Sequence, residues 1–227
     1  MTTPNHKIRL VMELRRAGVV DTRVLSAMER TPREVFCPPQ FLDRAYEDTA
    51  LPIAHGQTLS QPTVVGLMTQ AIDPGPRHTV LEVGTGSGYQ GAVLSLLCRR
   101  LYTIERHRPL LQDAEQRFRD LRLANVVTRH GDGWKGWPEQ APFDRIIVTA
   151  APGDVPGALV DQLAEGGILV VPVGREKRSQ SLVRVRKTAS GTETEELAAV
   201  RFVPMLTGVP TYATDDVVPD GSQRNRA

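Results

Sequence analysis

The chain has only two cysteines, only 5% aromatic residues and no clear excess of either charge. Cys37 and Cys98 lie far apart and outside any paired Cys/His spacing, so neither a disulfide framework nor a zinc site is indicated. The 28 basic and 26 acidic residues give a formal charge of +2, a field too weak to recruit nucleic acid or an anionic membrane. No run of ~18 or more apolar residues offers a membrane span. We therefore expect a soluble cytoplasmic protein with no nucleic-acid or membrane partner.

The distribution of apolar residues predicts one α/β domain over residues 1–210, since 227 residues suffice for a single substantial core. Residues 1–75 predict a helical lead-in. In residues 76–175, short β-rich runs alternate with helical patterns, which is typical of βαβ units and a doubly wound, mostly parallel sheet. Residues 176–210 alternate apolar with polar side chains and predict antiparallel strands at one edge of that sheet. The polar residues 211–227 predict a flexible tail.

Local patterns indicate the individual elements. Strands of the parallel sheet are expected at the β-rich runs TVLEV, LYTIE, NVVTR, RIIVTA and ILVVPV, and edge strands at SLVRVRK and LAAVRFVPM. Residues 155–163 predict a helix that the Gly166-Gly167 pair ends. Asp21 and Thr31 are candidate N-terminal caps of two early helices, the second with Pro32 at its first position. Two apolar helix faces are also expected, one with Leu110, Leu111, Ala114, Phe118 and Leu121, and one with Ile8, Val11, Met12 and Leu14.

A glycine-rich turn follows the first buried strand and opens a helix in LEVGTGSGYQ, which contains Gly84, Gly86 and Gly88. Such a turn brings backbone N–H groups and a helix N-terminus to the carboxyl end of the sheet, where nucleotide-like cofactors bind. The letters GSGYQG, from Gly86 to Gly91, also match the dinucleotide pattern GxGxxG. In that register the first glycine does not directly follow the strand, as the dinucleotide fold requires, so we discount this match.

Three acidic residues help to choose the cofactor. Glu105 ends the second strand, about twenty residues past the glycine turn, where a carboxylate accepts from ribose hydroxyls of NAD or S-adenosylmethionine alike. The charge of Glu82, just before the turn, opposes a pyrophosphate but suits an ammonium and a sulfonium. Asp132 could accept from an adenine amino group. Together they favour S-adenosylmethionine, although Glu82 could pair locally and residues 131–133 could form an ordinary turn.

The stretch HGQTLSQP, residues 55–62, gathers two hydroxyls and two side-chain amides in one short loop. No obvious catalytic partner stands beside Ser60 in the sequence. Ser60 or Gln61 could instead cap a helix that begins near Pro62. The apolar positions of that helix suit burial: Val64, Val65, Met68 and Ile72.

Five segments in one order give the chain a close resemblance to a known family: HGQTLSQP, VLEVGTGSGYQ, YTIER, HGDGWKGWPEQAPFDRIIVTAAP and GGILVVPVG. Over residues 10–205 the chain resembles the protein-L-isoaspartate O-methyltransferase family in its bacterial form. The resemblance implies an S-adenosylmethionine-dependent methyltransferase fold and methyl transfer to the α-carboxylate of isoaspartyl residues in damaged proteins and peptides. The ester then closes to a succinimide, whose hydrolysis returns some normal aspartate. A monomer is expected.

The resemblance also implies roles for individual residues. Ser60 is the expected catalytic residue, as a donor that positions the acceptor carboxylate and not as a nucleophile. A carboxylate with a pKa of about 3.3 to 4 is already ionised near neutral pH and needs no general base. The expected cofactor-binding residues are Thr58, Ser60, Glu82, Gly84, Thr85, Gly86, Gly88, Glu105, Asp132 and Gly133. The expected substrate-binding residues are Ala54, Gly56, Thr58, Leu59, Ser60 and Val203.

Three residues depart from the family's usual pattern: Ala54, Leu59 and Thr63 stand where Gly, Ile and an aromatic residue are often found. These departures leave the substrate preference open, whereas the expected fold and cofactor are unaffected. One alternative is methyl esterification of a normal aspartate in a dedicated peptide, or of a small-molecule carboxylate. Another is a cofactor-binding module without catalysis, which the hydroxyl-rich loop opposes.

The histidines and tryptophans have plainer expected roles. His55 and His130 lie nearer the site but lack Cys or carboxylate partners at metal-ligand spacing, so no metal site is expected. The other histidines, His6, His78 and His107, are expected at the surface. Trp134 and Trp137 could wall an adenine pocket, but packing is the favoured role.

Overall fold

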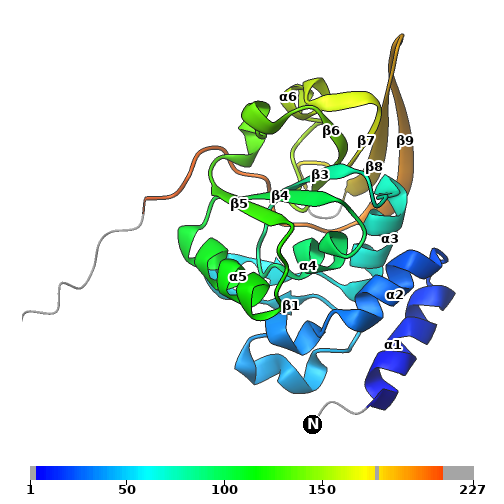
Figure 1. Cartoon of the computed structure of the whole chain (residues 1–227), viewed down its shortest axis with the longest axis vertical. Helices are drawn as coiled ribbons and strands as arrows, with labels where there is room; N and C mark the ends of the chain where they lie inside the picture. The colour runs from blue at the N-terminus through cyan, green and yellow to red at the C-terminus, as the bar shows by residue number, and fades with distance from the viewer. Residues whose placement is uncertain (1–3, 177–178, 212–227) are drawn as a thin grey trace, which may run out of the picture.

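The computed structural model describes residues 4–176 and 179–211. At its centre is a seven-stranded sheet in the order β5-β4-β3-β6-β7-β8-β9 (Figure 1). The strands from β5 to β7 in that order pair in parallel, and β8 and β9 add antiparallel at the edge. The predicted sheet is therefore confirmed. Its strands are β3 (Thr79–Val83), β4 (Arg100–Glu105), β5 (Val126–His130), β6 (Phe143–Val148), β7 (Leu163–Val173), β8 (Gln180–Thr188) and β9 (Gly191–Val200).

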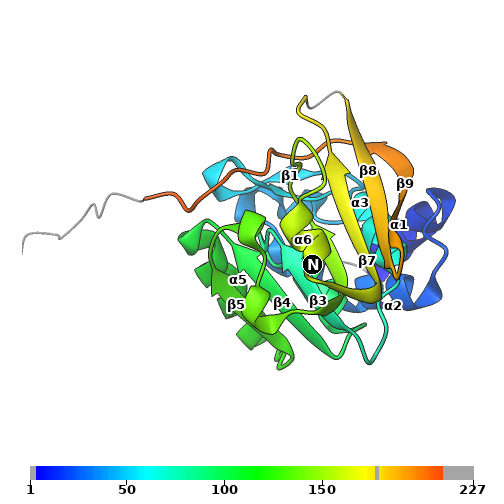
Figure 2. The same ribbon diagram turned by 90° about the horizontal axis from the view of Figure 1, so that it is seen from above.

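Helices cover both faces of this sheet (Figures 1 and 2). The helices α3, α4 and α5 lie on one face, and α6 lies on the other. Residues 4–50 are called the N-terminal cover below, and they begin with α1 and α2, which pack outside α3 and α4 as part of the predicted helical lead-in. The helices are α1 (Pro4–Arg16), α2 (Thr22–Arg30), α3 (Pro62–Ile72), α4 (Tyr89–Ser95), α5 (Arg108–Asp120) and α6 (Gly157–Asp161). Shorter elements are η1 (Arg33–Phe36), η2 (Pro39–Arg44), β1 (Leu51–Pro52), η3 (Ala54–Gly56), β2 (Thr58–Leu59), η4 (Gly133–Lys135) and η5 (Pro138–Gln140).

The central strands are buried on both faces, as their continuous apolar runs predict. Every residue of β3 is buried. Because neighbouring side chains of a strand point to opposite faces, Val80 packs in a cluster with Met68 of α3, whereas Leu81 packs with Leu159 of α6. The predicted apolar face of α5 is buried at Leu110, Leu111, Ala114 and Phe118.

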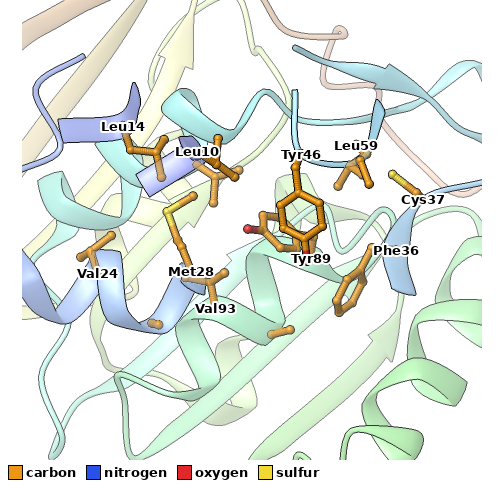
Figure 3. Close-up of a cluster of buried hydrophobic side chains, with 14 of the residues drawn as sticks. Leu10, Leu14, Val24, Met28, Phe36, Cys37, Tyr46, Leu59, Tyr89 and Val93 are labelled. Carbon is orange, nitrogen blue, oxygen red and sulfur yellow. The ribbon is translucent and has the colours of Figure 1, made fainter. Parts of the chain in front are cut away.

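The loop of residues 54–61, called the 54–61 loop below, is anchored to the N-terminal cover. Strands β1 and β2 pair antiparallel on either side of its tip, with Leu51 opposite Leu59. Leu59 is 1% exposed and belongs to the same apolar cluster as Leu10 of α1 and Tyr89 of α4 (Figure 3). Burial of Leu59 therefore fixes this loop against both the cover and the start of α4.

Two predicted boundaries near the sheet edge are wrong. Helix α6 ends at Asp161 and β7 starts at Leu163, so the Gly166-Gly167 pair lies inside a strand and does not end a helix. Strand β9 covers residues 191–200 and not 197–205, because the polar GTETEE stretch pairs with β8. Exposed charged side chains are typical of an edge strand. A pattern of alternating apolar residues does not indicate such a strand.

The N-terminal helices also correct two expectations. Asp21 caps α2 as predicted, but Thr31 ends that helix, and its hydroxyl donates to a carbonyl one turn earlier. In α1, Leu14 is fully buried, whereas Ile8 and Met12 are about half exposed. The predicted tail lies, from residue 212 onward, outside the described residues. The division of the chain into segments at residues 75, 175 and 210 stays a prediction.

Candidate active site

A pocket lies at the carboxyl ends of the parallel strands, where β3, β4 and β6 end side by side. Its walls come from the 54–61 loop, the glycine turn after β3, the end of β4, the end of β6 and the segment after β9. The space between these walls is about 870 Å³ when its opening to solvent is included. The predicted site residues on this wall are Thr58, Leu59, Ser60, Gly84, Thr85, Gly86, Glu105, Gly133 and Val203.

The glycine turn approaches its neighbours more closely than a side chain would allow. Gly84 has a φ of 99°, and a Cβ atom on it would lie 2.2 Å from the hydroxyl oxygen of Thr149, so glycine is required there. The amides of Gly84 and Thr85 donate to the carbonyl of Ile104 at 2.8 and 3.2 Å. These two amides are therefore not free to bind a phosphate, which agrees with discounting the dinucleotide pattern.

Glu105 is held at the end of β4 with its carboxylate in the pocket wall. It is only 5% exposed, and its two oxygens accept the amide of Gly86 at 2.8 Å and the amide of His107 at 2.9 Å. A carboxylate has about four acceptor positions, so lone pairs remain for ligand hydroxyls. The geometry fits the predicted ribose contact, which stays a prediction.

Glu82 lies behind the pocket wall and not in it. Its side chain is fully buried and accepts the hydroxyl of Thr103 at 2.6 Å. That hydroxyl is in turn 2.6 Å from the hydroxyl of Thr85, which lines the pocket. Burial raises the pKa of Glu82 to about 8, so the carboxyl is mostly protonated at neutral pH. The predicted contact between an ionised Glu82 and the cofactor is therefore wrong, and Glu82 instead supports Thr85 through Thr103.

Asp132 also does not line the pocket. Its two carboxylate oxygens accept hydrogen bonds from backbone amides. They accept from Trp134 at 3.0 Å and from Gly208 at 2.7 Å. The alternative of an ordinary turn thus describes this carboxylate, which holds the segment after β9 in place. The indole of Trp134 donates to the carbonyl of Met205 at 3.3 Å, and Trp134 does not line this pocket. The packing role favoured for this tryptophan stays a prediction.

Ser60 faces the pocket from the end of the 54–61 loop and is half-buried. Within the part of the chain that the structure describes, its hydroxyl has no protein partner. The capping alternative is wrong, because the Asp48 carboxylate takes that role: it accepts the amide of Thr63 at 2.8 Å and its hydroxyl at 2.7 Å. The Ser60 hydroxyl is therefore available to a ligand.

A stacked pair of histidines joins the 54–61 loop to the end of β4. The ring centroids of His55 and His107 are 5.3 Å apart, and the ring planes differ by 14°. His107 lines the pocket, so its predicted place at the surface is wrong. The predicted substrate residues Ala54 and Gly56 are exposed at the loop tip and do not line the pocket.

Gly88 packs against α5 and does not line the pocket, so its predicted contact with a cofactor stays a prediction. Its φ is 91°, and a Cβ atom there would lie 3.0 Å from the ring of Phe118 and 3.2 Å from the side chain of Ala114. Gly88 therefore faces α5 and lets the start of α4 pack closely against it.

Sequence reasoning missed several wall residues: Gln57, Val65, Val83, Ser87, Tyr89, Gln90, Ile104, Arg106, His107, Thr149, Ala150, Pro204, Met205 and Leu206. Many of them adjoin a predicted motif. Tyr89 and Gln90 directly follow the glycine turn, and Thr149 and Ala150 follow the end of β6. These residues could have been predicted from their position, because each lies next to the carboxyl end of a parallel strand.

Within residues 4–176 and 179–211 the structure has neither a metal-binding cluster nor a membrane-spanning helix. No group of three or more His, Cys, Asp or Glu side chains could hold a metal ion. No helix in these described residues is long and apolar enough to cross a membrane.

Comparison with known proteins gives the family. The model of a family described as protein-L-isoaspartate(D-aspartate) O-methyltransferase matches residues 5–209. The chain belongs to this family. The protein-L-isoaspartate O-methyltransferase of Rhodospirillum centenum is 60% identical over 228 residues, which cover 100% of both chains.

Two solved protein-L-isoaspartate O-methyltransferases have the same fold. One is 30% identical, with a TM-score of 0.78 over 87% of this chain, and the chain spans 65% of that protein's length. The other, from Plasmodium falciparum, was solved in complex with S-adenosyl-L-homocysteine. It is 26% identical, with a TM-score of 0.76 over 88% of this chain and 98% of that chain.

The protonation state of Glu82, the buried acid in β3, can be tested by the pH dependence of stability. Burial favours the neutral form of Glu82 in the folded protein, so the contribution of Glu82 to the free energy of unfolding should fall as pH rises from about 5 to about 8. Glu82→Gln cannot ionise and should fall less steeply, by up to about 1.4 kcal/mol per pH unit. Urea unfolding across this pH range measures both slopes. The exposed Glu165→Gln is the matched control, and equal slopes in wild type and Glu82→Gln would contradict a buried neutral acid.

Proposed function

We propose that this protein transfers a methyl group from S-adenosylmethionine to the α-carboxylate of L-isoaspartyl residues in damaged proteins and peptides. One observation carries the proposal: the half-buried Ser60 hydroxyl faces the same pocket as Glu105 and the glycine turn. A single cavity therefore joins a cofactor wall to a hydroxyl that can hold an acceptor. Family membership over residues 5–209 supports the same activity.

The residues present fit S-adenosylmethionine better than a dinucleotide. Glu105 offers a fixed carboxylate to ribose hydroxyls, while the amides of Gly84, Thr85 and Gly86 already donate to β4 and are not free for a pyrophosphate. A Cβ atom on Gly86 would meet nothing within 4 Å, so the turn leaves room for a ligand there. We assign cofactor binding to Glu105 and to the wall residues Thr58, Ser60, Gly84, Thr85, Gly86 and Gly133. When bound, S-adenosylmethionine supplies a methyl group on a positively charged sulfur.

Ser60 acts in this proposal by positioning the acceptor. The acceptor carboxylate, with a pKa of about 3.3 to 4, is ionised near neutral pH and needs no base to prepare it. The hydroxyl of Ser60 donates one hydrogen bond to a carboxylate oxygen and so fixes the direction of attack. Orientation of this kind can contribute a large part of a rate enhancement. Leu59 and Val203 line the same pocket as proposed substrate contacts, with Ala54 and Gly56 at the exposed loop tip.

The proposed partners are isoaspartyl-containing proteins and peptides. We propose a cytoplasmic monomer that binds neither nucleic acid nor membranes, with residues 1–210 as one domain. The near balance of 28 basic and 26 acidic residues supports the absence of a polyanionic partner.

Methyl transfer to a pair of matched peptides tests the proposed function. The two peptides differ only in whether one residue is isoaspartate or normal aspartate, and the methyl group of S-adenosylmethionine is labelled. We expect a base-labile methyl ester on the isoaspartyl peptide, formed without added metal and unaffected by a chelator. Esterification of the normal aspartate alone, or of a small-molecule carboxylate alone, would contradict the proposal. Stable methylation of a nitrogen would exclude carboxylate chemistry altogether.

Ser60→Ala should lower methyl transfer about 10- to 150-fold, because one hydrogen bond to a charged group is lost from the transition state. Single-turnover methylation of an isoaspartyl peptide measures this rate. Affinity for S-adenosylhomocysteine, measured by calorimetry, should remain nearly unchanged. Ser181→Ala is the matched control, since its hydroxyl lies outside the pocket wall and donates to Glu196 at 2.6 Å.

Two results would contradict the positioning role of Ser60. A nucleophile would form a covalent methyl-enzyme intermediate in the wild type, and the alanine variant would lose turnover almost completely. A side chain without a role in the reaction would leave the rate at the level of the Ser181→Ala control.

A further inference from the structure

Arg33 is a fully buried arginine at the start of η1, and it makes no ion pair with an acidic side chain among the described residues. Its guanidinium donates instead to backbone carbonyls. Nε donates to Ala45 at 2.9 Å, and Nη2 donates to Ser60 at 2.7 Å and, at the longer distance of 3.5 Å, to Thr49. One side chain thus joins the end of η2, the stretch before β1 and the 54–61 loop.

This arrangement of Arg33 costs folding free energy. Burial lowers its pKa, yet a guanidinium stays protonated in proteins. The charge of Asp48 acts on Arg33 without an ion-pair contact. Hydrogen bonds compensate a buried charge of this kind only partly, and an apolar side chain of similar volume is often at least as stable. The contacts of Arg33 therefore indicate that it positions the backbone segments it binds more than it stabilises the fold.

Arg33 lies directly behind the pocket wall. Its guanidinium carbon is 4.7 Å from the ring centre of Tyr89, and Tyr89 and Ser60 both line the pocket. Tyr89 is packed among side chains of the N-terminal cover, with the ring of Phe36 at a centroid distance of 5.5 Å (Figure 3). The arginine is therefore in contact with the wall at two places, the start of α4 and the acceptor-facing loop.

We propose that Arg33 is a positioning residue for methyl transfer and that it acts through the backbone of Ser60. This inference rests on the function proposed above. The bond from Arg33 to the Ser60 carbonyl fixes the peptide next to the Ser60 side chain, and the bonds from Thr63 to Asp48 fix the start of α3 just beyond it. Ser60 is thus held between two anchors. Its hydroxyl stands in one place before an acceptor arrives, which lowers the ordering needed on binding.

A double-mutant cycle tests whether Arg33 acts through Ser60. The four proteins are the wild type, Arg33→Met, Ser60→Ala and the double variant, and the readout is kcat/KM for an isoaspartyl peptide. Arg33→Met should lower kcat/KM roughly 10-fold or more in the wild-type background. In the Ser60→Ala background it should lower kcat/KM less than about 3-fold, because the hydroxyl that Arg33 positions is already absent. Equal losses in the two backgrounds would overturn the proposal.

Cofactor binding distinguishes positioning from general damage to the pocket. Affinity for S-adenosylhomocysteine, measured by calorimetry, should stay within about 3-fold in all four proteins, and a loss that parallels kcat/KM would overturn the proposal. Arg145→Met is the matched control. Arg145 is a partly buried arginine of β6 that donates to the carbonyls of Asp73 at 3.0 Å and Asp144 at 2.8 Å, outside the pocket wall. Its substitution should have the same small effect on kcat/KM in both backgrounds.

If Arg33→Met does not fold, Arg33→Lys takes its place in the cycle. A lysine keeps the charge but lacks the planar fork that holds two carbonyls at once, so a background-dependent loss is still expected. Wild-type kcat/KM in Arg33→Lys would overturn the proposal. Failure of the proposed function is a separate result, seen when the wild type does not esterify isoaspartyl peptide. The same cycle would then be run with the carboxylate that the protein does esterify.

Discussion

Parallel pairing of β3 with β4 on one side and β6 on the other is the constraint on which the site depends. The register places Val83 beside Ile104 and Val148, so the three strands end together at one edge of the sheet. The glycine turn, the carboxylate of Glu105 and the end of β6 meet there without any need for side-chain contacts to bring them together. The missing side chain of Gly84 then lets the turn lie against the end of β6. The cofactor half of the pocket follows from the sheet.

The acceptor half of the pocket has a different origin. It comes from the N-terminal cover, which inserts Leu59 into an apolar cluster shared with α1, α2 and α4 and so holds the 54–61 loop over the glycine turn. Arg33 and Asp48 fix the backbone on either side of the Ser60 side chain. The proposed positioning of the substrate therefore depends on the packing of residues that lie far from the sheet. The stability of the cover and the geometry of the acceptor site are two consequences of the same contacts.

The sequence predicted the parts of the protein that repeat a local rule. Short β-rich runs located β3 to β7, and the turn after β3 and the carboxylate of Glu105 at the end of β4 both lie on the pocket wall, as expected from their positions. The errors at the site share a physical cause, because the direction of a side chain depends on contacts that the sequence does not display. Glu82 has the position of a ligand-facing acid but points into the core toward Thr103. Asp132 faces amides from distant residues, and the burial of Arg33 beneath the site had no local signal at all.

The structure of a ternary complex tests the account most directly. The protein would be crystallised with S-adenosylhomocysteine and an isoaspartyl peptide, and the contacts of the acceptor carboxylate and of the ribose would be measured. The account predicts a carboxylate oxygen about 2.5 to 3.0 Å from the Ser60 hydroxyl oxygen, with ribose hydroxyls on the carboxylate of Glu105. A carboxylate bound away from Ser60, in a crystal where the peptide and cofactor product are both ordered, would contradict it.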